Sequence, residues 1–340
     1  MSTDLVRPVA TGRRDVEAGA MPRRPCIPDA LMVRPFTRGE ALALGLTARQ
    51  LQGREFRQLF PRVWVWTGLA MSELDWIVAA DLSMPDHAHL SHATRLHRLG
   101  LDVGPRRPLH FTAVGDLHRT HDDIFLHRAV VLPPPDEHGV TPTAAFIGLA
   151  STARVLDLVV AGDWLLHHGH MTLPGLRELA RHHDWRPGAA AAAAVTTHLD
   201  GRSRSPKESE SRAVVRFAGL PDPVVNARLD DDPAGPIGDL WWPRWRTVLE
   251  YEGRQHIGDV GQFNTDIARY AWMRRHDVAY LQVTHEMLRH PRALATAVHQ
   301  LLRTRGYPGL APVFGDHWDS LFQPSRRPTS RRHPHSVGGR

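Results

Sequence analysis

Three carboxylates in the last third of the chain have the types and spacing expected of a divalent cation site. Asp239 interrupts an apolar run (237–242), where an unpaired charge is costly, and Glu250 and Glu252 follow a proline-containing turn (243–245). If that turn closes a hairpin, antiparallel pairing places Asp239 beside Glu250 within a slip of one residue. Side chains alternate along a strand, so Glu250 and Glu252 share one face. Such clustered negative charge favours Mg²⁺ or Mn²⁺.

An ion held by these carboxylates would polarise a phosphodiester, deprotonate a water molecule and stabilise the charge on the leaving oxygen. Nearby arginines would hold the phosphate backbone. His256 lies four residues beyond Glu252 and is a candidate proton shuttle or phosphate ligand, with Gln255 as a weaker candidate for orienting water. A loop hydrogen bond for His256 and a solvated strand end for Glu252 are the structural alternatives.

The elements that must position these residues are expected in the order α-β-β-β-α-β-α. The leading helix begins at the cap Ser205 and carries Glu208, which either faces the site or completes a capping box with Ser205. The hydrophobic pattern predicts strands over 224–229, 237–242, 245–252 and 279–284, and helices over about 262–275 and around Leu294, Val298 and Leu301.

A second candidate interface lies in residues 37–68. Thr37 is expected to cap a short helix that ends at Gly45, Thr47 a second helix, and the alternation over 63–66 predicts a strand. Helix, turn, helix and ribbon is the order of a winged helix-turn-helix, whose second helix enters a DNA groove. That helix would offer to DNA the side chains of Arg49, Gln50, Gln52, Arg54 and Arg57. The alternative is a small helical cap with a solvated basic face.

The composition predicts a globular, strongly basic protein. The 340 residues are 42% hydrophobic, with a formal net charge of +6. Lys207 is the single lysine among 42 basic residues, and arginine suits phosphates and base edges, although codon bias would also explain it. One cysteine, Cys26, excludes an internal disulfide framework. With no apolar stretch long enough for a bilayer span and no secretory signal pattern, we expect a cytoplasmic protein with no membrane contact.

Shifts in composition divide the chain into segments. Both ends are rich in proline and arginine without periodicity, and an alanine run followed by a Gly/Ser/Arg-rich stretch interrupts the globular pattern near residue 200. We therefore expect a disordered tail (1–30), a winged-helix-like segment (31–70), a mixed α/β connector (71–186), a linker (187–204), a catalytic domain (205–308) and a basic disordered tail (323–340).

Residues 205–302 resemble the DUF559 group of Vsr-like endonucleases within the PD-(D/E)XK superfamily. The resemblance rests on SPKESESRAVVRFAGLP, GDLWWPRWRTVLEYEGRQH and the downstream segments DIAR and LQVT. It implies a restriction-endonuclease-like αβββαβ(α) core with Asp239 as central metal ligand, Glu250 as second ligand, Glu252 in place of the usual lysine, His256 as the nearby histidine and Glu208 on the leading helix. The signature lysine is absent from this motif.

Upstream, residues 37–68, LSHATRLHRLGL (90–101) and TPTAAFIGLASTARVLDLV (141–159) resemble the AbiEi-type winged-helix antitoxin region that is often joined to that nuclease domain. The two resemblances together imply a DNA-associated protein of α/β class.

The sequence therefore predicts metal-dependent hydrolysis of phosphodiester bonds in DNA. Asp239 and Glu250 would hold Mg²⁺, Glu252 would assist as ligand or base, and Glu208 and His256 would complete the site. Two alternatives stay open: a non-catalytic DNA-binding regulator of the antitoxin type, and a nuclease acting on RNA. A homodimer is an open alternative to a monomer.

Overall fold

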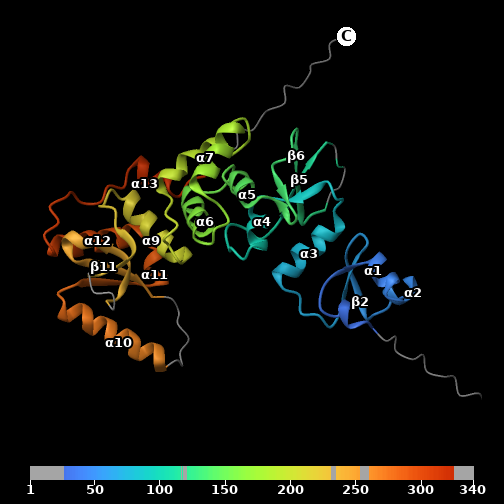
Figure 1. Cartoon of the computed structure of the whole chain (residues 1–340), viewed down its shortest axis with the longest axis horizontal. Helices are drawn as coiled ribbons and strands as arrows, with labels where there is room; N and C mark the ends of the chain where they lie inside the picture. Colours follow the sequence, from blue (N-terminus) through green and yellow to red (C-terminus); the bar gives the residue numbers. More distant parts are fainter. Residues whose placement is uncertain (1–26, 116, 118–120, 231–234, 253–259, 325–340) are drawn as a thin grey trace, which may run out of the picture. The chain divides into compact units, whose positions relative to one another are not determined.

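The computed structural model describes residues 27–115, 117, 121–230, 235–252 and 260–324, with the backbone alone for 260–267. It is a mixed α/β protein with several small sheets, as the sequence predicts (Figure 1). The contacts divide the chain into two compact units, Met1–Asp75 and Trp76–Arg340.

The first unit is a small three-stranded antiparallel sheet, ordered β1-β3-β2, with two short helices. Its core contains the side chains of Leu31, Phe36, Leu51 and Phe56. The predicted helix caps are confirmed, because Thr37 and Thr47 each accept a backbone N–H bond and each belongs to a capping box. The elements are η1 (Asp29–Leu31), β1 (Phe36–Thr37), α1 (Arg38–Ala43), α2 (Ala48–Leu51), β2 (Phe56–Phe60) and β3 (Val63–Trp66); α3 (Glu73–Ser83) begins in this unit.

The first half of the second unit joins a three-stranded sheet to a group of helices. The sheet is ordered β4-β5-β6, with β4 antiparallel and β6 parallel to the central strand. The elements are β4 (Ala88–Leu90), α4 (His92–Arg98), β5 (Leu109–Val114), β6 (Ile124–Ala129), β7 (Pro135–Asp136), β8 (Gly139–Val140), α5 (Pro142–Leu149), α6 (Val155–His167), α7 (Leu173–His182), α8 (Ala189–Val195) and η2 (Thr196–His198).

The segment 187–204, for which the sequence predicted a linker, begins with helix α8. Alanine has the highest helix propensity, so the alanine run is helical, and Ala192 and Val195 are buried on one side of it. A single apolar cluster extends from Ala93 to Leu321 across this segment. The connector and the C-terminal part therefore share one hydrophobic core.

The C-terminal part is a four-stranded sheet, ordered β12-β11-β10-β9, with helices on both faces (Figure 1). Leu240 and Trp242 pack with α9 and α12, whereas Trp241 and Val248 pack with Met273 of α10. The elements are α9 (Pro206–Phe217), β9 (Val224–Arg228), β10 (Ile237–Trp242), η3 (Pro243–Trp245), β11 (Thr247–Tyr251), α10 (Val260–Arg275), β12 (Ala279–Val283), α11 (His285–Leu288), α12 (Pro291–Thr304) and α13 (Asp316–Ser320).

The predicted element order is present, with small differences. Strand β11 runs from Thr247 to Tyr251, shorter than expected at both ends, and α10 begins at Val260. On α12 the predicted Leu294 and Val298 are buried. The third buried leucine or valine is Leu302, whereas the predicted Leu301 is only partly buried. The tails predicted at 1–30 and 323–340 lie largely outside the described residues. None of the helices in the described part of the chain is long and apolar enough to cross a lipid bilayer.

Candidate active site

Asp239 and Glu250 lie side by side on neighbouring strands. Leu240 pairs with Leu249 across β10 and β11, and continuing this register places Asp239 opposite Glu250, within the slip that the sequence allowed. Beyond the Leu240–Leu249 pair, the backbone N–H of Tyr251 donates to the side chain of Asp239, at 2.8 Å from its Oδ2. The two carboxyl groups therefore meet where the β10–β11 ladder ends.

Glu250 is a buried carboxylate that forms an ion pair with α10 through one of its two oxygens. The side chain of Arg269, on α10, donates to Glu250 Oε2 at 2.5 Å and also to the carbonyl oxygen of Ile237. Glu250 is 5% exposed, and its Oε1 atom is buried without a hydrogen-bond partner among the described residues. A buried acceptor without a partner is rare and calls for a physical explanation, such as a bound ion.

Burial and mutual repulsion perturb both carboxyl groups. Burial, reinforced by the charge of Asp239, raises the pKa of Glu250 to about 8, with Arg269 opposing the shift. Burial raises the pKa of Asp239 to about 6; the charge of Glu208 adds to this shift, and the Tyr251 N–H opposes it. Neighbouring carboxyl groups with raised pKa values are typical of sites that a cation or a proton must neutralise.

Glu208 is held toward Asp239 from the first turn of α9. Ser205 caps the helix by accepting the Glu208 N–H, but the Glu208 carboxylate does not return to Ser205. Its Oε2 atom instead accepts from the backbone N–H of Arg204 (2.9 Å) and from Asn226 Nδ2 (2.7 Å). Ser205 therefore caps α9 as expected, while Glu208 is fixed by its neighbours in a position where its charge acts on Asp239.

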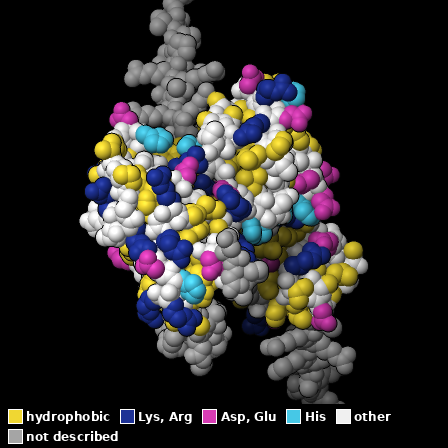
Figure 2. Space-filling view, turned by 60° about the vertical axis from the view of Figure 1, so that its left-hand side comes forward, with side chains coloured by type: hydrophobic (Ala, Val, Ile, Leu, Met, Phe, Trp, Pro, Cys, Tyr) yellow, Lys and Arg dark blue, Asp and Glu magenta, His cyan; other side chains and the backbone are white. Residues whose placement is uncertain are grey.

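Two of these acids, Glu208 and Asp239, line a pocket of about 660 Å³, and Glu250 lies outside its lining. Arg204, Arg228 and Arg269 line the same pocket. A lining that combines carboxylates with arginines provides groups for a cation and for phosphate oxygens, the two parts of a phosphodiester site. On the face that Figure 2 shows, basic side chains are interspersed with acidic and apolar ones.

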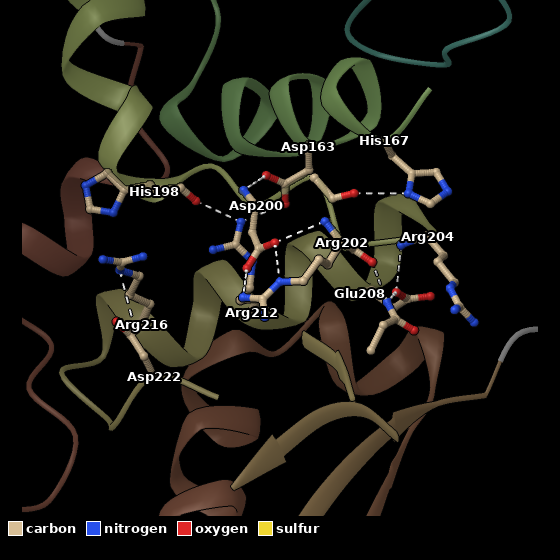
Figure 3. Close-up of polar contacts among 12 residues, drawn as sticks. Asp163, His167, His198, Asp200, Arg202, Arg204, Glu208, Arg212, Arg216 and Asp222 are labelled. Carbon is tan, nitrogen blue, oxygen red and sulfur yellow. Dashed lines mark hydrogen bonds and ion pairs between the residues drawn. The ribbon is translucent and has the colours of Figure 1, made fainter. Parts of the chain in front are cut away.

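The segment before α9 is held by a buried ion pair. Arg212 of α9 donates to Asp163 Oδ2 of α6 at 2.6 Å and to the carbonyl oxygen of His198 at 2.7 Å, and Asp200 N donates to Asp163 Oδ1 at 2.6 Å (Figure 3). Asn226 Nδ2 also binds the carbonyl oxygen of Arg202. Residues 198–205 are therefore fixed at several points, and with them the backbone N–H that holds Glu208.

Glu252, like Glu250, is not among the residues that line the pocket. Glu250 of β11 and Glu252, which follows the end of the strand, both contact α10, as their predicted common face requires. Glu252 is exposed, and its Oε1 accepts from Tyr270 Oη (3.2 Å) and Gln282 Nε2 (2.5 Å). In the described part of the chain, no group of three or more histidine, cysteine or acidic side chains could hold a metal ion. Of the three carboxylates predicted to form a metal site, the structure brings Asp239 and Glu250 together. A metal role for Glu252 stays a prediction.

Two further predicted residues, His256 and Gln255, lie outside the described residues.

The five residues predicted to contact DNA do not lie on one helix. Helix α2 ends at Leu51, so it carries Arg49 and Gln50 only, and Gln50 is occupied in the capping box with Thr47. Glycine at position 53 disfavours continuation of the helix. Gln52 and Arg54 follow in the turn, Arg57 lies on β2, and Arg49, Gln52, Arg54 and Arg57 are exposed.

Sequence reasoning missed three residues of this site. Arg269 is 19 residues beyond Glu250, and only the packing of α10 against the sheet brings them together. Asn226 gave a detectable signal, as a polar residue within the strand VVNAR, and it adopts a positive φ of 47°. Arg204 precedes the helix cap and contributes through its backbone and its place in the lining.

The raised pKa of Glu250 predicts a stability that falls with pH. The folded protein binds the Glu250 proton more tightly than the unfolded chain does, so this contribution is complete below about pH 4.5 and is lost as pH rises through about 8. Without divalent cations, we expect the melting temperature to fall between about pH 7.5 and 9, where histidines with the ordinary pKa near 6.5 are already largely neutral.

A pair of glutamine variants tests the cause. Glu250→Gln cannot ionise, so its melting temperature is expected to change less over this pH range than that of the wild type. Glu252→Gln, at an exposed position two residues away, is the matched control and is expected to keep the wild-type slope. Equal slopes in the wild type and Glu250→Gln would contradict the assignment of the shift to Glu250.

Comparison with known proteins adds relatives but no activity. No family model matches the chain, and no solved structure matches it significantly. Two curated proteins of Mycobacterium tuberculosis are similar, one from strain CDC 1551 / Oshkosh and one from strain ATCC 25618 / H37Rv, and both are described as uncharacterized. Each is 25% identical over 219 residues, which cover 61% of this chain and 79% of the relative.

Proposed function

We propose that the protein is a metal-dependent DNA endonuclease whose C-terminal part is a restriction-endonuclease-like domain of the DUF559/Vsr-like kind. The observation that carries the proposal is the pair Asp239 and Glu250, adjacent carboxyl groups with raised pKa values, in which Glu250 Oε1 is buried without a hydrogen-bond partner among the described residues. The order α9-β9-β10-β11-α10-β12-α12 supports it, since it is the order that the resemblance implies. The winged-helix nature of the first unit is part of the same proposal.

The donor set of the pair fits Mg²⁺ or Mn²⁺. Both ligands are hard carboxylate oxygens, and Glu250 Oε1 has no hydrogen-bond partner in the part of the chain that the structure describes. Mg²⁺ is commonly bound through one or two carboxylates, with water and substrate phosphate completing the shell. Asp239 and Glu250 would hold the ion, which when bound would activate a water molecule and polarise the phosphate. Because both carboxyl groups must be ionised to bind it, uptake near neutral pH would release protons.

The other residues of the pocket position the substrate and the ligands. Arg204 and Arg228 line the pocket beside Glu208 and Asp239 and would bind phosphate oxygens. Arg269 holds Glu250 Oε2, which fixes the orientation of the carboxylate beside Asp239. Glu252 holds Tyr270 and Gln282 across the edge of the sheet.

A non-catalytic DNA-binding regulator is the second candidate, and the ion pair between Arg269 and Glu250 favours it. Because Arg269 already places a positive charge beside Glu250, this carboxylate requires a metal cation less. In that case binding would rest on the exposed Arg49, Arg54 and Arg57 of the first unit.

A cleavage assay distinguishes the candidates. Purified protein is incubated with supercoiled plasmid, single-stranded DNA and RNA, each with Mg²⁺, with Mn²⁺ or with excess chelator. We expect nicking of duplex DNA that requires the divalent ion and stops on chelation. Retarded migration of DNA in the presence of chelator, with no loss of supercoiled plasmid under either ion, would support the regulator, and faster loss of RNA would change the assigned substrate.

A further inference from the structure

A row of four polar residues crosses the C-terminal sheet at the level of the proposed cation site. The register between β9 and β10 places Asn226 opposite Asp239. Glu250 follows Asp239 in the same row on β11, and Gln282 on β12 pairs with Glu250. The two acids on the central strands are therefore flanked by one amide residue on each outer strand.

The two amides bind carboxylates in different places. Asn226 Nδ2 donates to Glu208 Oε2 at 2.7 Å, and Gln282 Nε2 donates to Glu252 Oε1 at 2.5 Å. Asn226 and Glu208 line the pocket that Asp239 also lines, whereas Gln282 and Glu252 do not. Of these two pairs, only Asn226 with Glu208 therefore borders the pocket.

The side chain of Asn226 ties Glu208 to the segment before α9. Besides Glu208 Oε2, its Nδ2 atom donates to the carbonyl oxygen of Arg202 at 2.8 Å. An asparagine amide carries two N–H donors, a serine hydroxyl one and an ionised aspartate none, so neither of the latter would replace both bonds. The backbone φ of 47° at Asn226 is a left-handed conformation that asparagine tolerates better than most residues.

Glu208 is anchored through one oxygen, which leaves the other available. The residue is 8% exposed, and its Oε2 accepts from Asn226 and from the backbone N–H of Arg204 (Figure 3). Its Oε1 forms no hydrogen bond with the described residues and, unlike Glu250 Oε1, is not fully buried. This oxygen can therefore accept from a group that enters the pocket.

The anchored charge of Glu208 acts on its neighbour in the pocket. It adds to the effect of burial in raising the pKa of Asp239, so the two carboxylates are close enough to repel each other. A divalent cation relieves such repulsion, and Mg²⁺ usually keeps several water molecules that can donate to a carboxylate outside its coordination shell. Glu208 can therefore strengthen cation binding without being a direct ligand.

We propose that Asn226 is a positioning residue of the cation site, which holds the Glu208 carboxylate beside Asp239 and so strengthens the binding of Mg²⁺ or Mn²⁺. The inference rests on the cation site of the proposed endonuclease. It adds to that site a residue that acts through another side chain.

Titration of the full chain with Mn²⁺, followed by the paramagnetic resonance signal of the free ion, tests this role without a cleavage assay. We expect saturable binding by the wild type and an affinity at least about fivefold lower for Glu208→Gln, because the charge is lost. Glu210→Gln is the matched control, since Glu210 lies on the same helix outside the pocket lining, and it should bind like the wild type.

Asn226→Gly isolates the amide, because glycine tolerates the left-handed backbone. We expect it to lower the Mn²⁺ affinity at least about threefold, through loss of a hydrogen bond to a charged group. In the Glu208→Gln background the same substitution should have no further effect, because no charge remains to be positioned. A general loosening of β9 would lower the affinity in both backgrounds. Thermal melting establishes that the variants are folded.

The outcomes separate this inference from the proposed function. Equal Mn²⁺ affinity in the wild type and Asn226→Gly, or the same loss in both backgrounds, would overturn the role of Asn226 while the cation site stands. The expected pattern of affinities without any cleavage of nucleic acid would refute the endonuclease and still support the role of Asn226. Absence of Mn²⁺ binding by the wild type would overturn both.

Discussion

Replacing Asp239 by asparagine is expected to slow metal-dependent plasmid nicking at least about 100-fold. A divalent ion contributes several kcal/mol of transition-state stabilisation, and 2.7 kcal/mol corresponds to about a factor of 100. The amide retains the shape of the side chain and an oxygen that accepts from Tyr251 N, but it removes the charge that the ion requires. The measurement is the initial rate of loss of supercoiled plasmid at saturating Mg²⁺.

Stability separates this result from simple unfolding. Asp239 has a raised pKa, so its ionised form opposes folding, and Asp239→Asn is expected to melt at or above the wild-type temperature at about pH 8. Asp222→Asn is the matched control, because Asp222 lies outside the pocket and its side chain is 61% exposed. Nicking by a folded Asp239→Asn variant at the wild-type rate would refute the assigned role.

Replacing Arg212 by methionine is expected to lower the free energy of unfolding by about 3–5 kcal/mol. Its partner Asp163 is 0% exposed, so the variant leaves a buried carboxylate without its counter-ion. Burial already raises the pKa of Asp163 against the influence of Arg212. The measurement is urea-induced unfolding at about pH 7, followed by circular dichroism.

Two further variants show whether charge is responsible. Adding Asp163→Asn to Arg212→Met removes the stranded charge but keeps an oxygen for the N–H of Asp200, so it should recover at least about half of the loss. Arg202→Met breaks an ion pair with Asp200 in which the arginine side chain is 60% exposed, and about 1 kcal/mol or less is expected. Similar losses for Arg212→Met and Arg202→Met would rule out a special cost of burial.

The local part of this fold could be predicted from the sequence. The caps at Thr37, Thr47 and Ser205 were recognisable because a side-chain acceptor three residues before a backbone donor is a local pattern. Strand β10 was bounded correctly, since an apolar run ending at a proline has few alternatives. The register beside Asp239 followed from turn position, because a hairpin fixes its own pairing.

The sequence could not predict contacts that depend on packing between distant segments. Arg269 meets Glu250 because α10 lies against the sheet, and a spacing of 19 residues carries no such information. His92 and His127 stack because the first residue of α4 lies against the edge strand β6. The linker prediction failed to anticipate α8 because alanine runs are equally compatible with flexible segments and with a helix that buries small side chains.

The apolar cluster that runs from Ala93 to Leu321 limits how the chain can be cut into modules. A fragment that starts at Ser205 would leave the buried face of α9, including Val214 and Phe217, without part of its cover, and would separate Arg212 from Asp163. We therefore expect this fragment to be less stable on its own than the same segment is in the full chain. A chimeric protein that includes the pocket lined by Glu208 and Asp239 must therefore also include α6.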